Sequence, residues 1–136
     1  MNFVKFGALY ERILEDYKKN GNIIIAYDID DTVRPYRDSK ESCDLVVDLL
    51  KRANEVLNAS FIVFTSNKNI KKVESFLNSM GLPYDKINED MDWVKERDIT
   101  DGKIYYNLFL DDKAGLAESY DALNSLVLWV ESLNGR

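Results

Sequence analysis

Apolar residues recur along this chain at two different spacings, which predict helices in some segments and strands in others. Steps of three and four residues are typical of a helix with one buried face. Four segments show this spacing: Phe3 to Tyr17, Leu45 to Val56, Ile70 to Leu77, and Leu116 to Leu123. Gly21 and Gly81 follow the first and third of these segments, and glycine is a common helix stop.

Short, uninterrupted apolar runs predict buried strands, because a strand covered on both faces does not alternate with polar residues. The runs are Ile23 to Tyr27, Phe61 to Phe64, Tyr105 to Leu110 and Leu126 to Val130, with a less regular strand at Tyr84 to Asn88 and a short helix at Met91 to Arg97. Strands therefore alternate with helices. This order predicts an α/β fold with a mainly parallel sheet of about five strands and helices on both faces.

The length fits one domain. The 136 residues, 46% of them hydrophobic, match the roughly 100–150 residues of a typical domain with its own core. No internal repeat or low-complexity linker divides the chain. We expect residues 1–136 to form one domain, with an N-terminal helix at 1–20 and a core at 22–130.

The composition excludes several kinds of chemistry. The chain has no histidine, which rules out Ser-His-Asp and Cys-His catalysis and His-ligated zinc. Cys43 is the only cysteine, so neither an internal disulfide nor a thiolate zinc site can form, and a reducing compartment is expected. A net charge of −6 argues against general binding to nucleic acids or membrane surfaces, but it leaves a phosphorylated substrate open.

The start of the chain and its hydropathy predict a cytoplasmic protein. Met1 to Val4 lacks the basic start and long apolar core of a signal peptide, and no apolar run approaches the roughly 18 residues of a membrane span. We therefore expect no contact with membranes.

Three carboxylates, Asp28, Asp30 and Asp31, directly follow the first predicted strand. Two carboxylates about 4 Å apart repel each other by about 4 kcal/mol at an effective dielectric near 20, so such a cluster requires a cation or a proton. Ligands of parallel α/β sheets bind beyond the carboxyl ends of the strands. The sequence therefore predicts a metal site at this edge of the sheet.

The run from Asp28 to Val33 resembles the DxDx[TV] first motif of the haloacid dehalogenase (HAD) superfamily. Thr65, which follows the second buried strand, is similar to the second motif of that family. Asp111 and Asp112, which follow the strand ending at Leu110, are similar to the fourth motif. Lys103 stands eight residues before Asp111, where the third-motif lysine would be. The resemblance covers most of the chain.

This resemblance implies a three-layer Rossmann-like fold and a role for each matching residue. Asp28 would attack phosphorus and form an aspartyl-phosphate, and Asp30 would act as general acid and base. Mg²⁺ would be held by Asp28, Asp111 and the backbone carbonyl of Asp30, with Asp112 either a water-mediated ligand or a neighbour of the ligands. Thr65 and Lys103 would bind the transferring phosphoryl group, and Ser66 and Asn67 would join them in contacting the substrate.

The resemblance therefore implies a Mg²⁺-dependent phosphomonoesterase. The alternative is a module that binds phosphate and metal, or a partner, on the same fold without turnover. The segments after Val33 and between Gly81 and Lys103 are too short for a cap domain, which leaves the site open to a nucleotide, a nucleic-acid end, a phosphoprotein or a small molecule. The arrangement is loosely similar to the phosphatase half of phage polynucleotide kinase-phosphatases. Substrate identity and oligomeric state stay open.

Basic residues follow two of the motif-bearing strands. They are Arg34, Arg37, Lys68, Lys71 and Lys72. They form either a rim that attracts an anionic substrate or, for the three lysines, an ordinary solvated helix face.

Overall fold

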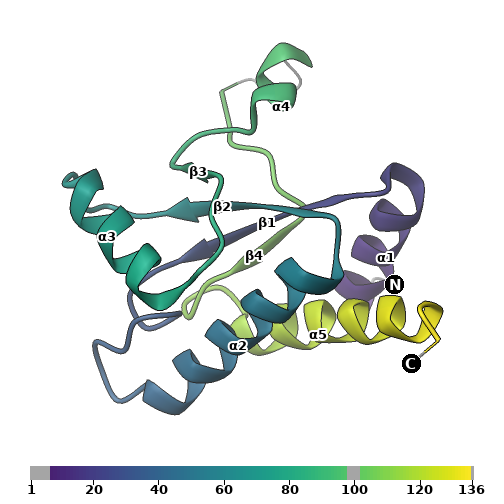
Figure 1. Cartoon of the computed structure of the whole chain (residues 1–136), viewed down its shortest axis with the longest axis horizontal. Helices are drawn as coiled ribbons and strands as arrows, with labels where there is room; N and C mark the ends of the chain where they lie inside the picture. Colours follow the sequence, from purple (N-terminus) through teal and green to yellow (C-terminus); the bar gives the residue numbers. More distant parts are fainter. Residues whose placement is uncertain (1–6, 98–101, 136) are drawn as a thin grey trace, which may run out of the picture.

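The computed structural model describes residues 7–97 and 102–135. Within these residues the elements are α1 (Ala8–Asn20), β1 (Ile23–Asp28), α2 (Lys40–Val56), β2 (Ala59–Phe64), α3 (Ile70–Met80), β3 (Lys86–Ile87), α4 (Asp92–Arg97), β4 (Leu108–Leu110) and α5 (Leu116–Leu133) (Figure 1). Helices and strands alternate as the sequence predicts.

The strands form one parallel, Rossmann-like sheet in the order β3-β2-β1-β4. Strand β1 is central and pairs with β2 through Ile25 and Phe61, and with β4 through Ile25 and Leu108. The first five residues of β1 are buried, which explains its uninterrupted apolar sequence. Because all the strands run in the same direction, their carboxyl ends lie along one edge of the sheet.

The two faces of the sheet are covered unequally. Ile23, Ile25 and Tyr27 of β1 belong to the larger apolar cluster, which also includes residues of α1, α2, α3 and α5. Ile24 and Ala26 belong to a smaller cluster that includes Val94 of α4. In Figure 1, α2 and α5 lie below the sheet and α4 lies above it. The successive side chains of β1 thus serve opposite faces, as the pleat of a strand requires.

The prediction of a strand at Leu126 to Val130 was wrong, because this run forms the C-terminal part of α5. Leu126, Val127 and Val130 are buried against the sheet, whereas Leu128 is 53% exposed. Burial therefore follows helical spacing. In the sequence, apolar residues at every position hide this period, and a short apolar run does not distinguish helix from strand. The described sheet consequently has four strands instead of about five.

Other boundaries also differ from those predicted. Strand β4 begins at Leu108, not Tyr105, and β3 is only two residues long. Helix α1 begins at Ala8, and the first six residues of the predicted helix lie outside the described part of the chain. Gly21 and Gly81 end α1 and α3 in the left-handed conformation, with φ of 73° and 66°, as expected for glycine stops.

None of the helices in the described ranges combines the length and apolar character needed to cross a membrane.

Candidate active site

Three carboxylates from two different strand ends converge at the carboxyl edge of the sheet. Asp28 is the last residue of β1, and Asp111 and Asp112 directly follow β4. The pairing of Tyr27 with Leu110 brings the ends of these two strands to the same level. As a result, one oxygen of each carboxylate lies within 4.8 Å of the other two.

Two carboxylates of this cluster, Asp28 and Asp112, hold protons more tightly than ordinary carboxylates do. Burial raises the pKa of Asp28, and the charges of Asp111, Asp112 and Asp30 add to the effect, partly offset by a hydrogen bond from the Ile29 N–H. The pKa of Asp112 is also raised, by desolvation and then by its hydrogen bond to Asp111 and the charge of that group. Such a cluster favours a proton or a cation, and an oxygen-only donor set fits Mg²⁺.

The loop after β1 is tied to the loop after β4. Thr32 is fully buried, and its Oγ1 accepts a hydrogen bond from the backbone N–H of Asp112 over 3.1 Å. The sequence identified Thr32 only as part of a motif, and its partner could not be read from spacing. This contact fixes the acidic loop after β4 relative to Asp28.

The side chain of Asp30 lies outside the carboxylate cluster. Its Oδ1 accepts hydrogen bonds from Arg34, over 3.0 Å from Nε and 2.5 Å from Nη2. The backbones of the two residues also form a β-bridge. Arg34 therefore sets the direction of the Asp30 carboxylate, and its guanidinium also lies 5.6 Å from the ring centre of Phe76.

Asp31 organises the segment that follows. It adopts a left-handed conformation with φ of 61°, and its Oδ1 accepts hydrogen bonds from the backbone N–H groups of Tyr36 and Arg37 and from the Ser39 hydroxyl. These bonds, first of all that from Arg37, hold the pKa of Asp31 below its ordinary value. The third carboxylate of the sequence cluster is thus used to fold the loop, and it is not part of the group that could bind a metal.

Thr65, which follows β2, is held by a residue that the sequence analysis missed. The side-chain amide of Asn88 accepts the backbone N–H of Thr65 over 2.9 Å and donates to its carbonyl over 2.8 Å. Asn88 directly follows β3 and has a φ of 55°, a conformation that asparagine tolerates better than most residues. In the sequence Asn88 stands only as the last residue of the strand predicted from Tyr84, which gives no sign of this pairing. The pair of bonds continues the pairing of β2 with β3 beyond the strand ends.

An open cavity of about 700 Å³ lies at the carboxyl edge of the sheet. Its walls include predicted site residues from the loops after β1, β2 and β4: Asp28, Asp30, Thr65, Ser66, Asn67 and Asp112. They also include residues to which the resemblance gave no role: Asp31, Arg34, Tyr36, Arg37, Lys72, Phe76 and Lys113.

The structure does not bring Lys103 to this cavity. Lys103 is exposed, and it precedes Asn107, whose backbone N–H bonds to the Ile24 carbonyl near the start of β1. Because Lys103 stands eight residues before Asp111, the sequence predicted that it would reach the site. However, β4 has only three residues, and the chain before this strand follows an irregular course. Lys72 and Lys113 are the lysines that line the cavity.

No protein-family model matches the chain, and comparisons with curated proteins and with solved structures also give no match.

Proposed function

We propose that the chain is a Mg²⁺-dependent phosphomonoesterase of the HAD type. The observation that supports this function best is the convergence of Asp28, Asp111 and Asp112, with carboxylate oxygens within 4.8 Å of one another. Asp28 and Asp112 share their cavity with Thr65. A carboxylate nucleophile, an acidic cation site and a hydroxyl donor are the groups that phosphoryl transfer to an aspartate requires.

In this proposal Mg²⁺ is held by Asp28, Asp111 and Asp112, with the backbone carbonyl of Asp30 implied by the resemblance as a further ligand. When bound, Mg²⁺ offsets the negative charge of the phosphate and of the attacking carboxylate. Thr65 would donate its hydroxyl proton to a phosphoryl oxygen, and its Oγ1 accepts a hydrogen bond from the N–H of Asn67 over 3.1 Å.

The proposed reaction has two steps at phosphorus. First, an oxygen of Asp28 forms a bond to phosphorus as the bond to the leaving oxygen breaks, and Asp30 protonates that oxygen. Then a water molecule attacks phosphorus, gives a proton to Asp30 and releases inorganic phosphate and the free Asp28 carboxylate. The contact with Arg34 keeps the Asp30 side chain in the cavity where both proton transfers would occur.

The resemblance gives Lys103 the role of the positive charge that binds the phosphoryl group. We propose that Lys113 has this role instead. Lys113 directly follows Asp112 and lines the cavity, and its backbone N–H is bonded to the Asp111 carboxylate over 3.1 Å. We also propose that the enzyme works without a cap domain. Between α3 and β4, the described chain forms β3, which joins the sheet, and the six-residue α4, which packs against it.

The test is release of inorganic phosphate from an aryl phosphate in the presence and absence of Mg²⁺. We expect turnover that requires Mg²⁺ and is abolished in Asp28→Asn. Asp48→Asn is the matched control, since Asp48 is exposed on α2 and does not line the cavity. Binding of Mg²⁺ and a phosphate analogue without hydrolysis across a broad panel of phosphomonoesters would instead establish the alternative, a non-catalytic binding module.

A further inference from the structure

Four basic side chains surround a cavity whose floor is acidic. Arg34 and Arg37 come from the loop after β1, Lys72 from α3 and Lys113 from the loop after β4. Four aspartates line the same cavity, so its lining is balanced in formal charge, although the chain as a whole has a net charge of −6. Basic side chains grouped in this way attract anionic ligands.

One phosphate group does not account for all of these cations. In the proposed function the scissile phosphate is contacted by Thr65 and Lys113, and Arg34 is paired with Asp30. Arg37 and Lys72 are left, and neither forms an ion pair with a carboxylate in the described part of the chain. Two basic groups that come from different segments and line one cavity are suited to a second anion.

The backbones of both residues are fixed. The N–H of Arg37 bonds to Asp31 over 2.8 Å, and the N–H of Lys72 bonds to the Asn69 side chain that caps α3. The first turn of α3 contains no acidic residue, so the positive end of the helix dipole adds to the charge of Lys72. The backbone therefore fixes where these two side chains begin, and both side chains are exposed.

An exposed aromatic residue lines the same cavity as this pair. The side chain of Tyr36 also lines the cavity, although 76% of Tyr36 is exposed, and its backbone is held by Asp31. An aromatic ring next to arginine and lysine is the combination on which a nucleobase stacks while its phosphates are bound.

We propose that the natural substrate is a phosphomonoester with a second phosphate group, which Arg37 and Lys72 bind while the first phosphate lies against Asp28. This inference rests on the proposed function and specifies its substrate class. A nucleoside bisphosphate, a phosphorylated oligonucleotide end and a sugar bisphosphate share this chemistry. Tyr36 contributes to binding only when the substrate has a base.

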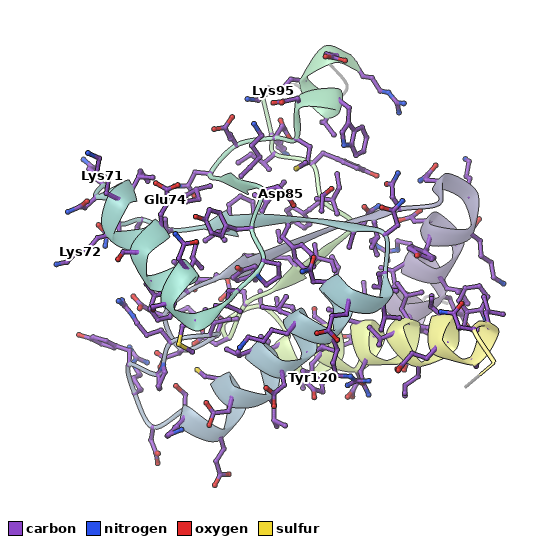
Figure 2. All side chains as sticks on the ribbon, viewed as in Figure 1. Lys71, Lys72, Glu74, Asp85, Lys95 and Tyr120 are labelled. Atoms are coloured by element: carbon purple, nitrogen blue, oxygen red, sulfur yellow. The ribbon has the colours of Figure 1, made fainter. Side chains whose placement is uncertain are left out.

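The chain offers a matched control for Lys72. Lys71 is its neighbour on α3 and is also exposed, but it does not line the cavity. Figure 2 shows the two lysines at the same end of that helix. Of the basic rim predicted from the sequence, Arg34, Arg37 and Lys72 line the cavity, and Lys68 and Lys71 do not.

The experiment compares kcat/KM for four substrates in the presence of Mg²⁺: p-nitrophenyl phosphate, a nucleoside 3′-monophosphate, the corresponding 3′,5′-bisphosphate and a sugar bisphosphate. A 3′-phosphorylated dinucleotide extends the series to an oligonucleotide end. We expect wild type to prefer bisphosphates over monophosphates by about ten- to a hundredfold, the range expected for hydrogen bonds to a charged group. Arg37→Ala and Lys72→Ala should remove this preference, mainly through KM, and Lys71→Ala should retain it. Tyr36→Ala should lower kcat/KM for the nucleotides and leave that for the sugar bisphosphate unchanged.

The failures of the two proposals are distinguishable. No hydrolysis of p-nitrophenyl phosphate or of any other member of the series by wild type overturns the proposed function, and this inference with it. Hydrolysis of the monophosphates with no preference for bisphosphates overturns the inference alone. So does an equal loss of preference in Lys71→Ala and Lys72→Ala, since that result would reflect net charge and not a binding site.

Discussion

The hydroxyl of Thr32 accepts the backbone N–H of Asp112 over 3.1 Å, across a separation of 80 positions in the chain. Thr32 is fully buried, and the bond spans the gap between the loops that follow β1 and β4. Asp28 and the two aspartates after β4 repel one another, and the bond holds their loops together against this repulsion. Thr32 therefore positions the acidic cluster without being part of it.

Replacing Thr32 with valine keeps the shape of the side chain and removes the acceptor. The partly buried N–H of Asp112 is then unpaired, which costs about 1–3 kcal/mol. We expect Thr32→Val to lower the free energy of unfolding by that amount in urea titrations and to weaken Mg²⁺ binding, measured by calorimetry. Thr32→Ser retains the hydroxyl and serves as the control. Equal Mg²⁺ affinity in the valine variant and wild type would contradict the positioning role.

The raised pKa of Asp28 predicts how stability depends on pH when no metal is bound. A carboxyl whose pKa is higher in the folded state than in the unfolded state stabilises the fold at low pH, and this contribution is lost as pH rises through the folded-state value. In EDTA, Asp28→Asn should therefore be more stable than wild type near neutral pH, because it removes one of three repelling charges. The difference should shrink as pH falls toward the ordinary aspartate value of 3.8.

Thermal unfolding of both proteins from acidic to neutral pH measures this effect. Adding Mg²⁺ should reverse the order, since wild type gains stability from the bound ion and Asp28→Asn gains little. A lower melting temperature for Asp28→Asn in EDTA at neutral pH would show that the Asp28 carboxylate stabilises the metal-free fold, contrary to this account.

Lys113 and Lys103 allow a direct test of which lysine acts in the site, since the structure favours Lys113 and the spacing in the sequence favours Lys103. Both lysines are exposed, and each alanine variant removes one positive charge, but only Lys113 lines the cavity. We expect Lys113→Ala to lower kcat for p-nitrophenyl phosphate by about a hundredfold, as loss of one group that stabilises the transition state does. Lys103→Ala should stay within about twofold of wild type, because a solvated surface charge contributes little. The opposite result would mean that the segment before β4 moves to the cavity when substrate binds.

The fold was predictable from the sequence where the apolar residues recur with a clear helix or strand spacing. The run from Ile23 to Tyr27 is confirmed as a buried strand, and Gly21 and Gly81 are confirmed as helix stops. The sequence could not give the end of α5, because apolar residues at every position from Leu126 to Val130 fit either period. The strand predicted at Tyr84 to Asn88 is present as β3, but the sequence could not give its bounds, because its two residues are only partly buried.

The site was predictable only to the level of strand ends. Parallel strands bring their carboxyl ends to one edge, so the proximity of Asp28 to Asp111 follows from the pattern of elements. The direction of a side chain within a tight loop does not follow from this pattern. Asp30 and Asp31 are neighbours in the sequence, but backbone geometry turns one toward Arg34 and the other toward the N–H groups of the following loop. Asn88 belongs to the same class, since its role depends on a pairing with a residue 23 positions away.

Leu126 and Leu128 test the corrected end of α5. In a strand these two residues would lie on the same face, whereas in the helix Leu126 is fully buried and Leu128 is 53% exposed. Leu126→Ala should therefore lower the free energy of unfolding by about 2–5 kcal/mol, the usual cost of a cavity in a core, measured in urea. Leu128→Ala should change it by about 0.5 kcal/mol or less, as surface substitutions do. Similar losses for the two variants would favour a strand, because alternate residues of a strand are buried together.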